Sequence, residues 1–151
     1  MNRGISFKIA GTKGKVLCEI LKCIGIKRYY WYSINSQAEV WTDYDGEEFL
    51  LQNSYSGDDF YNLIQMDLFI VFLKLLAYYE NDFTNDIHSY DDFVCSNCKL
   101  MLLIYDCEYV EIYAKELTVI DAIYMNAKNK GFSDLQYITD KNDNRKRMDI
   151  L

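Results

Sequence analysis

The 151-residue sequence predicts an α+β fold, with one mixed, mostly antiparallel β-sheet of about six to seven strands and helices mainly on one face. Segments with the alternating pattern of strands and segments with the period of amphipathic helices follow one another along the chain. Two pairs of strand segments are separated by only a few turn-forming residues, which favours antiparallel neighbours. Half of the residues are apolar or aromatic, enough for one core. We therefore expect a single globular domain over residues 1–140 and a polar tail over 141–151.

The first third of the chain predicts a strand, a helix and a hairpin. Apolar residues alternate with polar ones over residues 5–9, the pattern of a half-buried strand. From residue 12 they follow one helical stripe, which Gly25 is placed to end. Residues 29–34 and 38–42 are rich in strand-forming side chains. The polar residues between these two segments can turn the chain, so we expect a β-hairpin.

The middle of the chain predicts two short helices and a buried strand. Residues 47–51 could form a short helix after a turn, while Ser56 and Ser89 each begin an N-capping pattern with an acidic residue three positions later. Residues 68–77 are apolar on all sides, which fits a central strand covered on both faces. A single helix over residues 58–79 is the alternative, because no helix breaker separates these segments.

The last third predicts a hairpin, a helix and a strand. Residues 99–105 and 109–115 alternate around a short turn and are the clearest hairpin in the chain. Residues 119–127 form a helical stripe, and Gly131 follows two lysines in a favourable C-terminal cap. Residues 135–139 complete the sheet.

Several short segments near both ends form a recognisable pattern. They are Arg3-Gly4-Ile5-Ser6-Phe7, Glu19-Ile20-Leu21-Lys22, Leu102 to Lys115, Ala127-Lys128-Asn129-Lys130-Gly131-Phe132, Tyr137-Ile138-Thr139-Asp140 and Asn142-Asp143. These segments resemble a family of small bacterial proteins known as domain of unknown function 2691, and the resemblance is weakest between Gln37 and Phe93. It implies a compact bacterial cytosolic domain and brings no activity, cofactor or catalytic residue.

Charge is distributed unevenly along the chain. Residues 29–98 contain 13 Asp and Glu but one basic residue, Lys74, whereas residues 1–28 contain seven Lys and Arg and one Glu. The same middle segment holds 17 of the 24 aromatic residues. Aromatic side chains provide rigid contact area and charges steer a partner, so this composition indicates an interaction surface. A compositional accident is the plainer alternative.

We predict that the protein is not an enzyme and that this acidic, tyrosine-rich surface binds another protein with a basic surface. The carboxylates could imitate phosphates against a defence nuclease, or the protein could be an immunity-type inhibitor. Direct binding to nucleic acid is disfavoured by like charge. The predicted partner-binding residues are Asp43, Asp45, Glu47, Glu48, Asp82, Asp86, Asp91, Asp92, Trp41, Tyr44, Tyr78, Tyr79 and Tyr90.

The motifs that could carry chemistry each have a plainer interpretation. Cys95 and Cys98 have the spacing of a zinc or redox pair, but His88 and Cys107 complete no standard zinc pattern, so we interpret them as structural thiols. Residues 11–15 lie where an anion could bind at a helix N-terminus but lack the spacing of a phosphate-binding loop. Residues 140–151 imitate a calcium loop without its glycine or its last glutamate. We therefore predict no cofactor and no metal.

A small-ligand-binding protein or an enzyme with a pocket at the sheet edge is the competing class. The chemistry would then come from His88, which is the only histidine, from Tyr105 or from Tyr113. A pocket of several hundred cubic ångströms with converging polar groups would favour this class. The chain has no apolar leader and no apolar run of membrane-spanning length, so we expect it to be cytoplasmic, with reduced cysteines.

Overall fold

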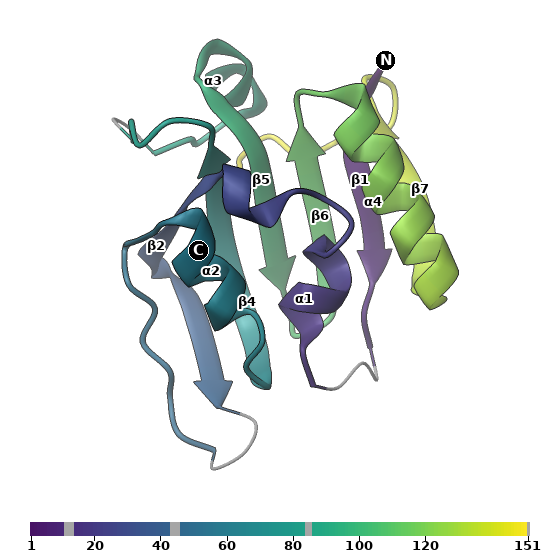
Figure 1. Ribbon diagram of the computed structural model, residues 1–151. Helices are drawn as coiled ribbons and strands as arrows, with labels where there is room; N and C mark the ends of the chain where they lie inside the picture. The colour runs from purple at the N-terminus through teal and green to yellow at the C-terminus, as the bar shows by residue number, and fades with distance from the viewer. Residues whose placement is uncertain (11–13, 43–45, 84–85, 151) are drawn as a thin grey trace.

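The computed structural model describes residues 1–10, 14–42, 46–83 and 86–150. These residues form a single open β-sheet with helices and loops packed on it. Its strand order is β3-β2-β4-β5-β6-β1-β7, and every pair of neighbouring strands is antiparallel (Figure 1). The strands are β1 (Asn2–Lys8), β2 (Tyr30–Thr42), β3 (Ser54–Tyr55), β4 (Leu68–Tyr78), β5 (Cys98–Tyr105), β6 (Tyr109–Ala114) and β7 (Ser133–Thr139). The predicted α+β class is confirmed.

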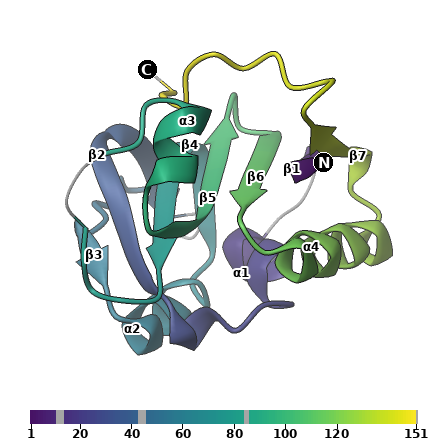
Figure 2. The same cartoon turned by 90° about the horizontal axis from the view of Figure 1, so that it is seen from above.

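Helices cover one face of this sheet, and short segments cover part of the other. On the first face lie α1 (Val16–Leu21), the 3-10 helix η1 (Ile26–Arg28), α2 (Gly57–Leu63) and α4 (Leu117–Lys130). On the second face lie α3 (Tyr90–Cys95) and the C-terminal segment, residues 141–150, drawn in yellow in Figure 2. None of the helices in the described part of the chain is long and apolar enough to cross a membrane.

Each face of the sheet has its own core, as the alternation of side chains along the strands requires. The larger core contains Leu73 of β4 and Leu102 of β5, packed with Ile120 of α4. The smaller core contains the residues that point the other way, such as Leu76 and Met101. The inner part of β4 is buried on both faces, so its sequence is apolar there apart from Lys74. The single-helix alternative for residues 58–79 is wrong, because α2 ends at Leu63 and residues 68–78 form a strand.

The predicted hairpin over residues 29–42 is wrong, because these residues form the single strand β2. The register against β4 shifts between Ser33 and Ala38, so the polar residues between them form a bulge instead of a turn. The bulge buries the side chain of Gln37, whose Oε1 accepts a hydrogen bond from the backbone N–H of Ile150 at 2.6 Å. A tertiary contact with the C-terminal segment therefore accounts for residues that resemble a turn in the sequence.

The short helix predicted over residues 47–51 is also wrong, because this segment runs extended beside β2. The backbone N–H of Phe49 donates to the carbonyl of Val40, and the backbone of Glu48 forms an isolated antiparallel β-bridge with that of Trp41. Pairing with the outer edge of β2 satisfies backbone groups that a helix would have satisfied internally.

The predicted helix ends are confirmed. Ser56 and Ser89 accept hydrogen bonds from the backbone N–H groups of Asp59 and Asp92, at 3.2 and 3.1 Å. Gly131 ends α4 with a φ of 75°, a conformation that glycine adopts without steric cost. Local hydrogen bonding decides these positions, which is why the sequence pattern alone locates them.

The C-terminal segment has the polar composition predicted for residues 141–151, but the described part of it is not a solvated tail. It contains no helix or strand, yet Met148 is fully buried against the sheet. Its backbone N–H donates to the carbonyl of His88 at 2.9 Å. Arg145 forms an ion pair with Glu111 of β6 at 2.5 Å. Charged residues hold this segment in place because their partners lie on the sheet.

Gly57 fixes the position of α2 against η1. A Cβ atom at residue 57 would lie 2.0 Å from the backbone oxygen of Lys27. We expect Gly57→Ala to lower the free energy of unfolding by at least about 2 kcal/mol, because backbone must move to relieve the overlap. Gly25→Ala is the control, since its Cβ would meet the flexible side chain of Arg28. Equal urea-denaturation midpoints for the two variants would contradict this account.

Candidate functional site

Lys74 is buried inside the second face of the sheet. Its side chain has no exposed surface, and its Nζ donates to the backbone carbonyl of Ile87 at 2.5 Å. The same nitrogen lies 3.1 Å from Oδ1 of Asp86 and 3.2 Å from Oδ1 of Asp149. A buried ammonium group is costly unless it is paired and hydrogen-bonded, and here three oxygen atoms surround it.

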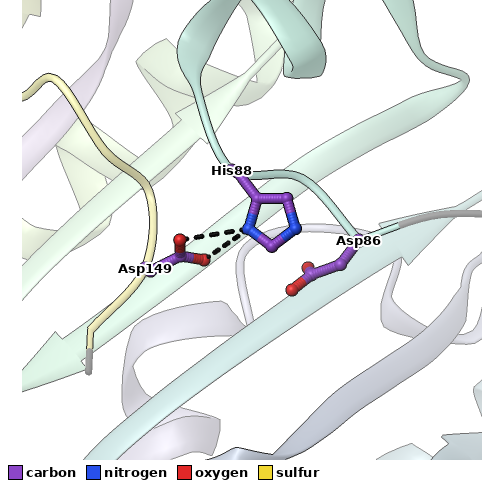
Figure 3. A group of neighbouring side chains, drawn as sticks. All are labelled: Asp86, His88 and Asp149. Carbon is purple, nitrogen blue, oxygen red and sulfur yellow. Dashed lines mark hydrogen bonds and ion pairs between the residues drawn. The ribbon is translucent and has the colours of Figure 1, made fainter.

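Asp149 is the most highly connected member of this group. Its carboxylate lies 2.9 and 3.0 Å from Nδ1 of His88, as Figure 3 shows. It also accepts hydrogen bonds from Arg147 at 2.8 Å and Gln37 at 3.2 Å. Burial by itself would raise the pKa of the Asp149 carboxyl, but the hydrogen bonds from Arg147, His88, Gln37 and Lys74 outweigh burial and hold this pKa well below its usual range.

These contacts define the Lys74 cluster, which consists of Gln37, Lys74, Asp86, His88 and Asp149. Its members come from the bulge of β2, the middle of β4, the segment before α3 and the C-terminal segment. A lone lysine in the apolar run of β4 was the one sequence signal for a buried charge. Gln37 and Asp149 gave no such signal, because they lie 112 residues apart in the chain.

Asp86, His88 and Asp149 also have the composition of a metal site. Their ligand atoms all lie within 4.8 Å of one another. Lys74 Nζ already lies within hydrogen-bond distance of both carboxylates, so it supplies the positive charge that they require. A divalent ion in this position would lie beside an ammonium group, and like-charge repulsion would oppose its binding. We therefore interpret the cluster as an internal ion-pair network.

The cysteines of the proposed pair lie in different environments. Cys98 is fully buried, and burial raises the pKa of its thiol to about 11. Cys95 is exposed at the end of α3. Cys107 follows the far end of β5, roughly 25 Å away along the strand. The described cysteines therefore do not converge with His88 on one zinc position.

An open hollow of about 430 Å³ lies next to the Lys74 cluster, between the segment after β4 and α3. Its lining includes Asp82, Asp86 and Asp92, with Tyr78, Cys95 and Asn97. Asp86 pairs with Lys74, and Asp82 accepts a hydrogen bond from Asn97 Nδ2 at 3.4 Å. Among the ion pairs formed within the described residues, none reaches Asp82 or Asp92. We call this the acidic hollow.

The structure divides the predicted partner-binding residues between two ends of the sheet. Those after β4 and in α3 lie at one end, while Trp41, Glu47 and Glu48 lie at the other. The two groups of residues lie about 30 Å apart along β4, because Trp41 is paired with Phe69 near the start of this strand and the other group follows its end at Tyr78. Asp43, Tyr44 and Asp45 lie outside the described residues.

The exposure of the predicted residues also differs. Glu47, Glu48, Asp82, Asp91 and Asp92 are exposed, while Asp86 and Trp41 are partly buried. Tyr78 is buried beside Tyr32, at a ring-centroid distance of 5.5 Å. Partly buried Tyr79 donates to Glu116, and the ring of Tyr90 packs under the guanidinium of Arg3. These three tyrosines contribute mainly to packing within the protein.

The tyrosines of the competing enzyme hypothesis lie in a different region. Tyr113 is buried and donates to Asp143 at 3.2 Å. Tyr105 lines a second open hollow, of about 500 Å³, between the C-terminal segment and strands β1, β6 and β7. His88 is absent from the lining of that hollow. The three residues therefore do not converge on one site.

Asp149→Asn is expected to lower the free energy of unfolding by about 3 kcal/mol at pH 7, because the buried Lys74 loses the more buried of its two counter-charges. Urea denaturation measures the change. Asp140→Asn, just before the C-terminal segment, is the matched control, since Asp140 is 55% exposed and its ion pairs are solvated. A destabilisation of Asp149→Asn no larger than that of the control would contradict the role of the Lys74 cluster.

The contribution of Asp149 to stability is expected to depend on pH. Because its pKa is lower in the folded protein, the stabilisation is complete above the unfolded value near 4 and is lost as the pH falls through the folded value. The groups facing it are Lys74, Asp86, His88 and Arg147. We compare the free energy of unfolding of the His88→Gln protein with that of the His88→Gln/Asp149→Asn protein. The difference between these two free energies should stay constant from pH 7 to 5 and become smaller below about pH 4. A constant difference down to pH 2 would contradict the assignment.

Comparison with known proteins places this chain in a family. It is 36% identical over 155 aligned positions to the "Uncharacterized protein YncE" of Bacillus subtilis (strain 168), covering 99% of this chain and all of the relative. No solved structure matches it. The model of the family described as "Protein of unknown function (DUF2691)" matches residues 2–149, as the resemblance in the sequence predicted. The chain therefore belongs to this family.

Proposed function

We propose that this protein is a non-enzymatic, cytoplasmic protein-binding protein that docks the acidic hollow on a basic surface of another protein. The observation that carries the proposal is the convergence of Asp82, Asp86 and Asp92 around one open hollow. Asp82 and Asp86 come from the segment between β4 and α3, and Asp92 comes from the first turn of α3. The fold has thus gathered part of the acidic middle of the sequence.

A lysine or arginine side chain of the partner suits this hollow. Two of the three carboxylates have no ion pair with a basic residue of the described chain, so their charge is available to a cation from outside. Charge-assisted hydrogen bonds from a guanidinium group to carboxylates are among the strongest in proteins. Exposed Asp91 adds negative charge nearby and would increase the rate of encounter with a basic surface.

The basic surface of the partner could itself be a nucleic-acid-binding site. An inhibitor that covers such a site presents carboxylates where phosphates would bind, and an immunity-type protein blocks its cognate toxin by the same physics. Direct binding of nucleic acid is not part of the proposal, because the chain has a formal net charge of −7. The role is therefore an inhibitory or regulatory contact between proteins.

A small-ligand-binding function is the second candidate. The hollow of about 500 Å³ beside the C-terminal segment favours it, since Ser6, Gln136 and Arg145 converge there. Arg145 is already paired with Glu111, which leaves less of its charge for a ligand. The two functions differ in the residues on which binding depends.

The triple change Asp82→Asn, Asp91→Asn and Asp92→Asn is expected to abolish the capture of partners from a lysate of the native host at low salt. Wild-type capture should weaken steeply as salt is raised, since exposed charge pairs are screened within about 8 Å at physiological ionic strength. Quantitative mass spectrometry of the captured proteins measures both effects. Asp86 is left unchanged because it pairs with buried Lys74.

The matched control is the triple change Asp58→Asn, Asp59→Asn and Asp106→Asn. These residues are exposed elsewhere on the molecule, so the control removes the same charge. It should retain the captured partners. Equal loss in both triple variants would reduce the effect to net charge, and equal retention would reject the acidic hollow as the binding site.

A further inference from the structure

An apolar patch lies on the second face of the sheet, at the end remote from α3. Trp41 and Phe69 are directly opposed across β2 and β4, and Phe72 is opposed to Glu39 in the same pair of strands. Their neighbours Val40, Ile70 and Leu73 belong to the core beneath the helices, so the patch residues point away from that core. Leu50 lies beside them, since Phe49 also packs against that core.

The patch is exposed, in contrast to the rest of this face. Leu50 is 81% exposed and Phe69 is 49% exposed, while Leu76 and Met101, on the same face nearer α3, are fully buried. Trp41 and Phe72 are partly buried. α3 and the start of the C-terminal segment lie at the other end of the strands (Figure 1), and the exposed side chains of Phe69 and Leu50 show that this end of the face is not buried. Exposed apolar side chains that lie next to one another are typical of interaction sites.

Acidic side chains border the patch on the side of β2. Glu39 lies within it and accepts a hydrogen bond from Trp41 Nε1 at 3.0 Å, which fixes the indole. Glu48 forms an isolated β-bridge with Trp41, so the side chains of these two residues lie on the same face. No ion pair within the described residues joins Glu39 or Glu48 to a lysine or arginine. An apolar centre with a charged rim is the usual anatomy of a protein interface.

A hollow of about 270 Å³ adjoins the patch. Phe72, Tyr105 and Ile150 form part of its wall, and Asp106, Arg145 and Asp149 form the charged part. Interface hot spots are commonly side chains that fill such a depression next to an aromatic surface. An apolar side chain of a partner could lie against Phe72 at the edge of this hollow while its neighbours cover Phe69 and Trp41.

We propose that this patch docks a protein segment that carries large apolar side chains interspersed with lysine or arginine. Charge complementarity selects this occupant, because the glutamates of the rim would pair with the basic residues. A two-fold contact with a second copy is disfavoured, since it would bring the same glutamates together around one apolar centre. The site is separated from the acidic hollow by the length of β4 and does not depend on it.

The test uses a synthetic twelve-residue peptide of alternating leucine and lysine as the probe. Trp41 is a built-in reporter, because the other tryptophan, Trp31, is fully buried and stacked on Phe60. Binding should shift the tryptophan emission to shorter wavelength in the wild type and leave it unchanged in Trp41→Phe. Phe69→Ser and Leu50→Ser should each weaken binding about tenfold or more.

The controls separate this site from the acidic hollow and from non-specific attraction. The triple variant at Asp82, Asp91 and Asp92 should bind the leucine–lysine peptide as the wild type does. Peptides with serine for leucine, or glutamate for lysine, should bind at least tenfold more weakly than the probe. Phe69→Ser and Leu50→Ser should fold normally because both side chains are exposed, and thermal unfolding verifies this.

Four outcomes would overturn the proposal. The first is equal affinity of the wild type and the Phe69→Ser protein for the leucine–lysine peptide, and the second is equal affinity of the wild type for the peptide with serine in place of leucine. The third is no binding of the leucine–lysine peptide at millimolar concentration. The fourth is self-association of the wild type that Phe69→Ser abolishes. The last would assign the patch to a second copy of this chain. Each is independent of whether the acidic hollow captures a partner.

Discussion

The buried ammonium group of Lys74 is the interaction on which the second face of the sheet depends. It lies in the centre of β4, where both faces are covered, and it needs acceptors from outside that strand. Asp86 precedes α3 and Asp149 lies near the end of the chain, so pairing with Lys74 brings these two segments together. The charge thus specifies which segments cover this face, whereas apolar packing alone is not directional.

This arrangement also explains why the second face is only half covered. The C-terminal segment reaches Lys74 and Gln37 near the middle of the face, and α3 lies at one end. Beyond Gln37, strands β2 and β4 continue to Thr42 and Leu68. Their outward side chains there include Trp41 and Phe69, which no described segment buries. The proposed docking patch is therefore a direct result of where the covering segments end.

The antiparallel pairing of β2 and β4 determines what becomes of the acidic middle of the sequence. Acidic residues follow β2 at one end of the sheet and follow β4 at the other, so folding separates them by the length of the strands. It also uses one of them, Asp86, to neutralise the only basic residue of the segment. The acidic segment of the sequence therefore forms two separate acidic surfaces. One lies beside polar groups at the α3 end, and the other lies beside exposed aromatic residues at the opposite end.

Local features were readable from the sequence. The N-caps at Ser56 and Ser89, the C-cap at Gly131 and the alternation of β5 and β6 depend on residues a few positions apart, so their patterns were sufficient for the α+β class. The bulge of β2, the buried position of Gln37 and the Lys74 cluster depend on residues up to 112 positions apart, and only the tertiary structure decided them. A local pattern cannot indicate which distant acid a buried lysine will meet, because that choice is made by the packing of the whole sheet.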